Sequence, residues 1–417
     1  MNTTSKIVAL SSAVAFALQI ALALLMLRYF SPEEVGMYSV ISQIGFFWTT
    51  LALAQAPLRL LANHGASVID DARHAWVSSL QRFVFLSPVA ALAVWWSGLL
   101  FVNALLWALL LSLFQLTWML AQSMRLRMEG VWAQAGVRVL PALMALLVAA
   151  AAVFMQWSGP ALLAAALLGY AVGAAWLLPA LLVFFQDKFD KISTKQDEAG
   201  LSPTLREPSR PATALASGDN RSVALRMAHT LADALLATAI VVVWQRLYSA
   251  QETGWMAAPL RVMGFVPALV HVAWAQVILA QPKFLRTNPL WVGLGGFACV
   301  ALFGVGCAFA IEMGWLDERW HGVQSYLLPL VLWQGSACLS AAYSYLPFQA
   351  QSAHFYSLMC IGVTIIQSVM LLIPTIFANS LSAPLHLLMF GAASALLFSA
   401  QAFYINLLGT KILKSTH

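Results

Sequence analysis

Apolar stretches long enough to cross a membrane recur along the whole chain. A membrane-spanning helix needs about 20 mostly apolar residues. Twelve stretches approach or meet that length: 7–28, 37–61, 82–102, 104–123, 138–157, 161–185, 224–246, 255–280, 290–313, 323–347, 355–377 and 384–408. The sequence therefore predicts an all-α, polytopic membrane protein with about twelve transmembrane helices.

The scarcity of charge excludes the main soluble classes. Only 9% of the residues are charged and 61% are hydrophobic, whereas about 25% of a soluble globular chain is charged. A soluble enzyme, a secreted domain and a disordered chain are all excluded on this ground. The net charge is +6, but the bases are scattered between apolar stretches. We therefore expect the lipid bilayer as a partner and no nucleic acid.

Neither a metal nor a cofactor is expected. The four cysteines lie in apolar stretches and form no CxxC pair: Cys299, Cys307, Cys338 and Cys360. They are interpreted as packing residues. The Walker A pattern, GxxxxGK followed by Ser or Thr, is absent, so ATP is not expected to bind to this chain. Transport would then need an ion gradient, consumption of the product outside, or another subunit.

A polar segment at 187–222 divides the chain. It is rich in charged residues and contains three prolines, which is typical of a flexible linker. The predicted organisation is a six-helix half at 1–186, a cytoplasmic linker at 187–222 and a second six-helix half at 223–417.

The placement of Lys and Arg predicts the orientation in the membrane. With the N-terminus inside, the cytoplasmic side receives the linker bases and Lys6, Arg59, Arg73, Arg82, Arg125, Arg127, Arg138, Lys283, Arg286, Lys411 and Lys414. The other side receives Arg28, Arg246 and Arg319, and the acids Glu33, Glu34, Glu252, Glu312, Asp317 and Glu318. Both termini are therefore expected in the cytoplasm. The first apolar run is interpreted as a retained helix and not as a cleaved signal peptide.

A short segment is repeated in the two halves. Residues 28–36 read RYFSPEEVG and residues 246–254 read RLYSAQETG, an offset of 218 positions. Each segment follows the first helix of its half. Since six spans return the chain to the same side, the halves are predicted to be parallel repeats with a cavity between them. The segment could form a capped hairpin between helices or contact a substrate directly.

The repeated turn also carries a family resemblance. The segment LRYFSPEEVGMYSVISQIGFFWTTLALAQAPLRL resembles the first two helices of Wzx-type polysaccharide flippases of the multidrug/oligosaccharidyl-lipid/polysaccharide (MOP) exporter superfamily. Ser31 stands where the family's turn begins with Gly, and Trp255 stands where a Tyr is usual in the second half. The resemblance implies that an undecaprenyl-pyrophosphate-linked oligosaccharide moves across the bacterial inner membrane. Other polysaccharide-assembly proteins are candidate partners.

Three ionisable residues share one face of the seventh predicted helix. Asp233 lies about 13 Å along this helix at 1.5 Å per residue, and Arg226 and His229 precede it on the same face. Ionisable groups within spans are functional candidates by default. Asp233 and His229 are ion-coupling candidates, and Arg226 could meet a phosphate. Alternatively, the three residues pair with one another and hold the helices in register.

Further polar residues are candidates to line the cavity. Arg261 lies in the eighth predicted helix, and its counterpart at the 218 offset is Gln43. A pyrophosphate needs cationic partners with the forked geometry of Arg. Arg261 could instead extend to the membrane surface or pair with Asp233. Arg28 and Arg246 could contact substrate or anchor the ends of their helices at lipid headgroups.

The leading hypothesis is alternating-access transport of a lipid-linked oligosaccharide for O-antigen, capsule or exopolysaccharide synthesis, and not an enzymatic reaction. A cation-coupled exporter of drugs or small solutes is the first alternative. It would need an acidic or apolar pocket. A membrane enzyme that acts on polyprenyl glycans is the second. It would need clustered acids or bases on one aqueous face.

Overall fold

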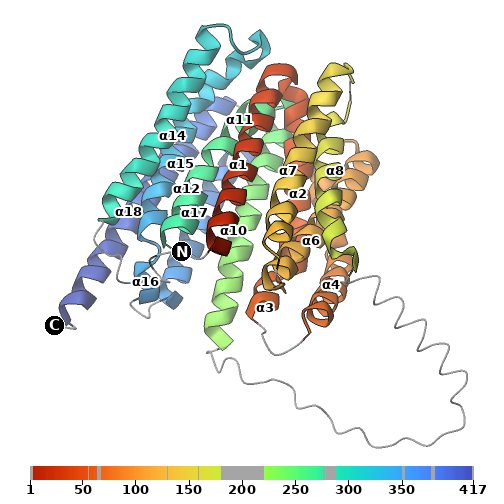
Figure 1. Ribbon diagram of the computed structural model, residues 1–417. Coiled ribbons are helices and arrows are strands. Elements are labelled where there is room, and N and C mark those ends of the chain that lie inside the picture. Colours follow the sequence, from red (N-terminus) through yellow and green to blue (C-terminus); the bar gives the residue numbers. More distant parts are fainter. Residues whose placement is uncertain are drawn as a thin grey trace, which may run out of the picture. The chain divides into compact units, whose positions relative to one another are not determined.

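The computed structural model describes residues 3–54, 56–62, 67–128, 130–157, 159–179, 220–275, 278, 288–349, 353–376 and 381–415. These residues form helices joined by turns, with no strand among them (Figure 1). Each of the twelve predicted stretches is helical over most of its described residues. The predicted linker lies outside the described residues except for 220–222, which begin a helix.

The helices before the linker are α1 (Thr3–Tyr29), α2 (Pro32–Leu53), α3 (Ala56–Ala62), α4 (Val68–Phe85), α5 (Ser87–Ser97), α6 (Phe101–Arg127), α7 (Val131–Phe154), α8 (Ala161–Ala174) and the 3-10 turn η1 (Ala175–Leu177). Those after it are α10 (Asn220–Leu247), α11 (Ala250–Met263), α12 (Phe265–Leu269), the π-helical η2 (Val270–Ala275), α14 (Pro289–Glu312), the 3-10 turn η4 (Glu318–Val323), α15 (Gln324–Tyr343), α16 (Leu346–Gln349), α17 (Ala353–Ile376) and α18 (Ala383–Ser415).

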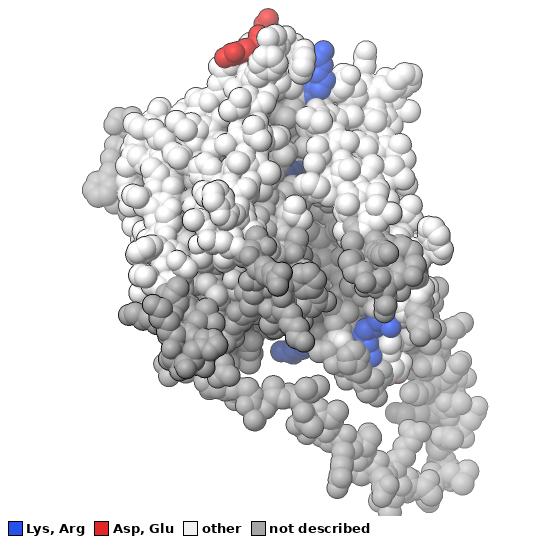
Figure 2. All heavy atoms as spheres, turned by 60° about the vertical axis from the view of Figure 1, so that its left-hand side comes forward, with Lys and Arg blue, Asp and Glu red and all other residues white. Residues whose placement is uncertain are grey.

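The fold class predicted from the sequence, an all-α polytopic membrane protein, is confirmed. Seven helices of the described residues are long and apolar enough to cross a membrane, and the count is eight if the bent pair α4 and α5 is one span. One face of the molecule shows an almost entirely uncharged described surface, with the visible acidic side chains at one end (Figure 2). Such a surface suits contact with lipid.

The third predicted stretch differs from the structure at its start. The prediction began at residue 82, but α4 begins at Val68. Its first turn carries Asp70 and Asp71, so hydropathy alone does not detect it. These acids suit the positive end of the helix dipole. The helix then bends by 49° where α5 begins, close to Pro88.

Contacts divide the chain into two compact units. Unit 1 comprises Met1–Gln19, Gly45–Ala91 and Leu105–Asn220, and unit 2 comprises Ile20–Ile44, Leu92–Ala104 and Arg221–His417. The end of α1 and the first half of α2 thus group with α10–α18, as does the turn between α5 and α6. The repeated segments 28–36 and 246–254 therefore both lie within unit 2.

Within unit 1, one arginine binds the end of α2. The Arg82 Nε donates to the carbonyl of Ala52 at 2.7 Å, and its Nη2 donates to that of Leu53 at 3.3 Å. Next to it, the ring of Trp48 stacks on Phe83 with centroids 4.2 Å apart. Arg82 satisfies carbonyls that the end of a helix leaves without intrahelical partners.

Two arginines at the end of α6 also donate to backbone carbonyls of other helices. The Arg127 Nη1 donates to the Leu60 carbonyl at 2.9 Å and to Asp71 at 2.8 Å. The Arg125 Nη2 donates to the carbonyl of Trp176 at 3.1 Å. Three of the bases expected on the cytoplasmic side are thus bound to helix ends inside this unit.

Within unit 2, α15 is the central helix and packs against α14 and α18. Its buried Ser340 donates to the Gln401 side chain of α18 at 3.0 Å. The Gln367 amide of α17 donates to Ser394 of α18 at 2.9 Å. Buried hydrogen bonds of this kind hold apolar helices together where water is absent.

Candidate functional site

Arg261 lies on α11, 11 residues after its first residue, about 16 Å along the helix axis at 1.5 Å per residue. Its Nη2 donates to the Ser42 hydroxyl of α2 at 3.3 Å. Its guanidinium carbon lies 4.6 Å from the centre of the Tyr38 ring. A hydroxyl and an aromatic face hold this cation in place without neutralising its charge.

Among the described residues, Arg261 forms no ion pair. In particular, Asp233 pairs with His229 and not with Arg261. A half-buried guanidinium without a carboxylate partner attracts an anion, and its forked donors match a phosphate.

Gln43, the repeat counterpart of Arg261, follows Ser42 directly on α2. Its backbone carbonyl accepts a hydrogen bond from the Thr238 hydroxyl of α10 at 3.4 Å. The structure therefore brings α2, α10 and α11 together at this level, within unit 2. The Gln43 side chain is half-buried.

The second polar cluster joins α10 to α17. The His229 Nε2 lies 3.0 Å from the Asp233 Oδ2, and the Thr364 hydroxyl donates to the Asp233 Oδ1 at 3.2 Å. The edge of the His229 ring meets Tyr356, with centroids 6.0 Å apart. The Asp233 side chain is 57% exposed, and that of His229 is 22% exposed. An imidazole and a carboxylate at this distance can exchange a proton.

Arg226 lies on α10, but its side chain is outside the described residues. The predicted grouping of Arg226 with His229 and Asp233 therefore stays a prediction.

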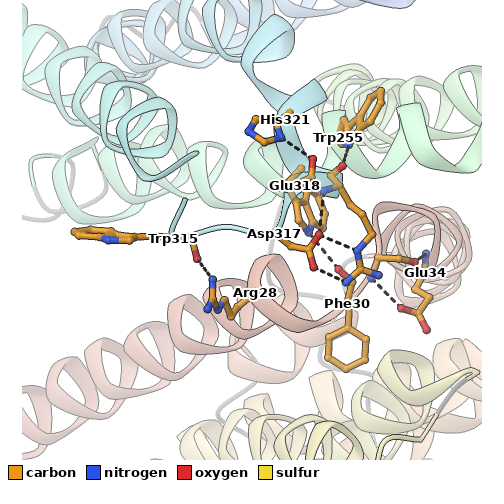
Figure 3. A network of polar contacts seen from close by, with 11 residues as sticks. Arg28, Phe30, Glu34, Trp255, Trp315, Asp317, Glu318 and His321 are labelled. Carbon is orange, nitrogen blue, oxygen red and sulfur yellow. Dashed lines mark hydrogen bonds and ion pairs between the residues drawn. The ribbon is translucent and has the colours of Figure 1, made fainter. Parts of the chain in front are cut away.

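The other two predicted arginines lie at turns of unit 2. The Arg28 Nη1 donates to the carbonyl of Trp315, in the loop between α14 and α15 (Figure 3). Arg246 lies beside the turn between α5 and α6, where its Nη1 would be 3.4 Å from a Cβ added at Gly98. Both side chains are exposed.

The repeated segments build equivalent helix starts. The Ser31 hydroxyl accepts from the Glu34 amide at 3.2 Å, and the Glu34 carboxylate accepts from the Ser31 amide at 2.9 Å. This reciprocal pair is a capping box. In the second segment, the Ser249 hydroxyl accepts from the Glu252 amide at 3.1 Å. The Glu252 carboxylate accepts instead from the Tyr326 hydroxyl of α15.

Removing either cap should destabilise unit 2. We expect Ser31→Ala and Ser249→Ala each to cost about 1 kcal/mol, because each leaves an amide of the first helical turn without its partner. Thermal unfolding of the purified protein in detergent measures this loss. Ser325→Ala is the control, because this exposed hydroxyl donates to the Gly322 carbonyl and caps no amide. Equal midpoints for all three variants and the parent would refute the capping roles.

The sequence analysis did not identify the loop between α14 and α15 as part of a polar network (Figure 3). Trp320 is fully buried and donates through Nε1 to the Phe30 carbonyl at 3.2 Å. Trp255 donates to the Arg319 carbonyl at 2.8 Å. The two tryptophans and the bases near this turn are visible in the sequence, but their backbone partners lie far away along the chain.

The same loop holds an exposed ion pair. The Arg319 Nε and Nη2 donate to the two oxygens of Asp317 at 3.0 Å and 2.8 Å. These hydrogen bonds lower the pKa of Asp317 from 3.8 to about 2. The stabilisation that this ion pair gives to the folded state is thus complete above about pH 4, and it is lost only as the pH falls through about 2.

Asp317→Asn should therefore have the same effect at pH 5 as at pH 8, and that effect should be small because the pair is exposed. Unfolding midpoints of the variant and the parent at the two pH values test this. If the difference in unfolding midpoint between variant and parent shrinks by half or more from pH 8 to pH 5, Asp317 takes up a proton in that range. That result would contradict a pKa held low by the pairing with Arg319.

Comparison with solved structures identifies the type of fold. The chain matches no protein-family model and no curated protein. Among solved structures it is similar to the inward closed conformation of the lipid II flippase MurJ, with 11% identity and a TM-score of 0.57 over 98% of this chain and 87% of that one. The chain has a MATE/MurJ-type fold. An inward-facing MATE family multidrug resistance transporter of the MOP superfamily matches at 11% identity and a TM-score of 0.53, over 96% of both chains.

A third match has the same fold. The MATE multidrug transporter DinF-BH matches at 14% identity and a TM-score of 0.51, over 97% of this chain and 96% of that one. The MATE/MurJ-type fold is therefore shared by structures described as a flippase and as multidrug transporters. In this chain, both polar clusters lie in unit 2, one at Arg261 and one at His229 and Asp233.

Proposed function

We propose that the protein moves an undecaprenyl-pyrophosphate-linked oligosaccharide from the inner to the outer leaflet of the bacterial inner membrane, by alternating access. This transport would supply the synthesis of O-antigen, capsule or exopolysaccharide. The MATE/MurJ-type fold supports transport, and a lipid II flippase is among the similar structures. The Wzx-like turn at residues 31–38 supports the same substrate class.

The observation that carries the proposal is the unneutralised charge of Arg261. A cation within a membrane-inserted helix is costly unless it has a partner. In the described residues its partners are the neutral Ser42 and Tyr38. A diphosphate bound to Arg261 would supply the missing negative charge and accept its forked donors.

The His229–Asp233 pair is the proposed coupling site. A carboxylate that accepts from both His229 and Thr364 joins α10 to α17. Adding or removing a proton changes this contact, so the pair can link a proton gradient to a change in the packing of the two helices.

Export of cationic drugs is the second candidate, because two of the similar structures are multidrug transporters. A cationic substrate needs a carboxylate, and Asp233 is 57% exposed. Arg261 favours the anionic substrate, since a second cation beside it would be repelled. The membrane-enzyme alternative has little support, because the outward acid Asp317 is paired with Arg319.

Proteoliposomes test the proposal. The purified protein is reconstituted with a fluorescent polyprenyl-diphosphate oligosaccharide, and an impermeant quencher reports how fast the label leaves one leaflet. We expect faster exchange than in protein-free vesicles, and no acceleration for an uncharged lipid carrying the same glycan. Uptake of a lipophilic cation without exchange of the diphosphate lipid would overturn the proposal in favour of drug export.

A further inference from the structure

A buried histidine in the first turn of α18 has one nitrogen without a partner. His386 is 2% exposed. Its Nδ1 lies 3.0 Å from the hydroxyl of Tyr248, which directly follows α10, and the Trp244 ring stacks on the imidazole with centroids 4.7 Å apart. Its Nε2 has no hydrogen-bond partner among the described residues. Because an unpaired buried polar group is costly, packing alone does not explain a histidine at this position.

The Tyr248 hydroxyl determines which nitrogen of His386 carries the hydrogen. Burial and the nearby Glu252 carboxylate raise the pKa of Tyr248 to about 12, so the hydroxyl stays protonated and donates to Nδ1. The neutral ring then carries its hydrogen on Nε2. An imidazole held in this way can gain a proton at Nδ1 and release the proton at Nε2 on its opposite side.

The other titratable groups near the ring lie behind Tyr248 and Trp244. Trp244 donates to the Tyr326 hydroxyl of α15 at 3.5 Å, and Tyr326 donates to the Glu252 carboxylate of α11. Among the described residues, His386 forms no ion pair. No carboxylate of this part of the chain therefore fixes the charge of the imidazole.

Buried polar side chains continue from His386 toward the proposed coupling site. The backbone of Leu371 on α17 lies next to the His386 ring. One turn before Leu371, the buried Gln367 donates to the buried Ser394 of α18 at 2.9 Å. Another turn before that, the buried Thr364 donates to the carboxylate of the coupling site at 3.2 Å. Positions 364, 367 and 371 share one face of α17, because they are three and four residues apart.

The polar face of α17 joins two ends of unit 2. The end of α10 and the start of α18 lie on the side that the Lys and Arg distribution predicts outside the cytoplasm. The coupling site lies further along α10, where Asp233 meets Thr364. A proton gradient can drive this site only if protons reach it from the outer side, and chains of ionisable and polar side chains serve this purpose in transporters.

We propose a proton route from the outer end of unit 2 to the coupling site, formed by Tyr248, His386, Gln367, Ser394 and Thr364. The Tyr248 hydroxyl passes its proton to Nδ1 and takes another from water outside. The imidazolium releases its Nε2 proton to water held by the polar side chains between α17 and α18, and the coupling site accepts that proton. All these residues belong to unit 2. The inference rests on the proposed function, because it assigns the supply route of its coupling site.

Proton uptake in the absence of substrate tests the route. Right-side-out and inside-out membrane vesicles that contain the protein are adsorbed on a solid-supported electrode, and a rapid pH jump produces a charge displacement as the coupling site binds protons. Vesicles with Asp233→Asn supply the blank. In right-side-out vesicles, we expect His386→Gln to keep the total charge and to slow its decay by about tenfold or more, because a proton-transferring group is lost. In inside-out vesicles, the decay should stay at the parent rate.

Tyr248→Phe provides a second variant in case His386→Gln does not fold. It removes only the hydroxyl at the entrance, and we expect slower decay in right-side-out vesicles again. Ser340→Ala is the matched control, because it also removes a buried hydrogen bond, to Gln401 of α18, but lies outside the route. The decay of this control should match the parent.

The outcomes separate the route from the functions on which it rests. Decay at the parent rate in the folded His386→Gln and Tyr248→Phe variants, or slower decay in both kinds of vesicle, would overturn the route. A parent protein that moves no more charge than the blank would refute the coupling site and the route together. The readout requires no lipid-linked oligosaccharide, so each of these failures is distinct from a failure of the proposed flippase function.

Discussion

Replacing Arg261 with glutamine should reduce exchange of the diphosphate lipid by roughly 10- to 100-fold. Hydrogen bonds to charged groups contribute about 1.5–3 kcal/mol, and about 1.4 kcal/mol corresponds to a factor of ten. Glutamine keeps a polar side chain but removes the charge and the fork. Initial exchange rates in proteoliposomes, at equal protein content and with matched thermal stability, measure the effect.

Two further variants separate charge from geometry. Arg261→Lys keeps the charge without the planar fork, so its rate should fall between those of the parent and the glutamine variant. Arg59→Gln makes the same charge change on the exposed surface of α3 and should leave the rate within about twofold. Exchange by Arg261→Gln at the parent rate would remove Arg261 from the binding site.

The second large effect is expected at Asp233. Asp233→Asn removes the negative charge that His229 meets at 3.0 Å, and an amide cannot take up the proton. We expect transport to lose its dependence on an imposed pH gradient and to fall by about tenfold or more under a gradient. Exchange rates in vesicles with and without the gradient measure both changes.

Matched variants identify the group that carries the proton. His229→Gln removes the imidazole and should also abolish the gradient dependence. Thr364→Val removes one hydrogen bond to Asp233 and should keep the dependence while lowering the rate. Full gradient dependence in both Asp233→Asn and His229→Gln would exclude this pair as the coupling site.

The fold class was predictable from the sequence because membrane helices have a strong local signal. Apolar length and the absence of charge mark each helix independently of its neighbours. Where a helix starts with acids, as α4 does at Asp70 and Asp71, hydropathy misses its first turns. The break between α4 and α5, close to Pro88, is not visible in hydropathy.

The contacts of the candidate site were predictable only where its residues are spaced by a helix turn or related by the repeat. The spacing of four residues between His229 and Asp233 predicts that they meet, and they do. The 218 offset relates Arg261 to Gln43, and Arg261 contacts the adjacent Ser42. By contrast, the contacts of Arg28 and Trp320 are made with backbone carbonyls. Every residue has a backbone carbonyl whatever its side chain, so the sequence could not indicate which carbonyls would be the partners.

The most direct test of the proposed flippase function is made in the bacterium that carries the gene. The gene is deleted, and the polyprenyl-diphosphate glycans are labelled with a reagent that reaches only the outer leaflet. We expect full-length lipid-linked glycans to accumulate unlabelled while surface polysaccharide disappears, with rescue by the parent gene and not by Arg261→Gln. Unchanged glycans and surface polysaccharide, together with increased drug sensitivity, would contradict the flippase function and identify the protein as a multidrug exporter.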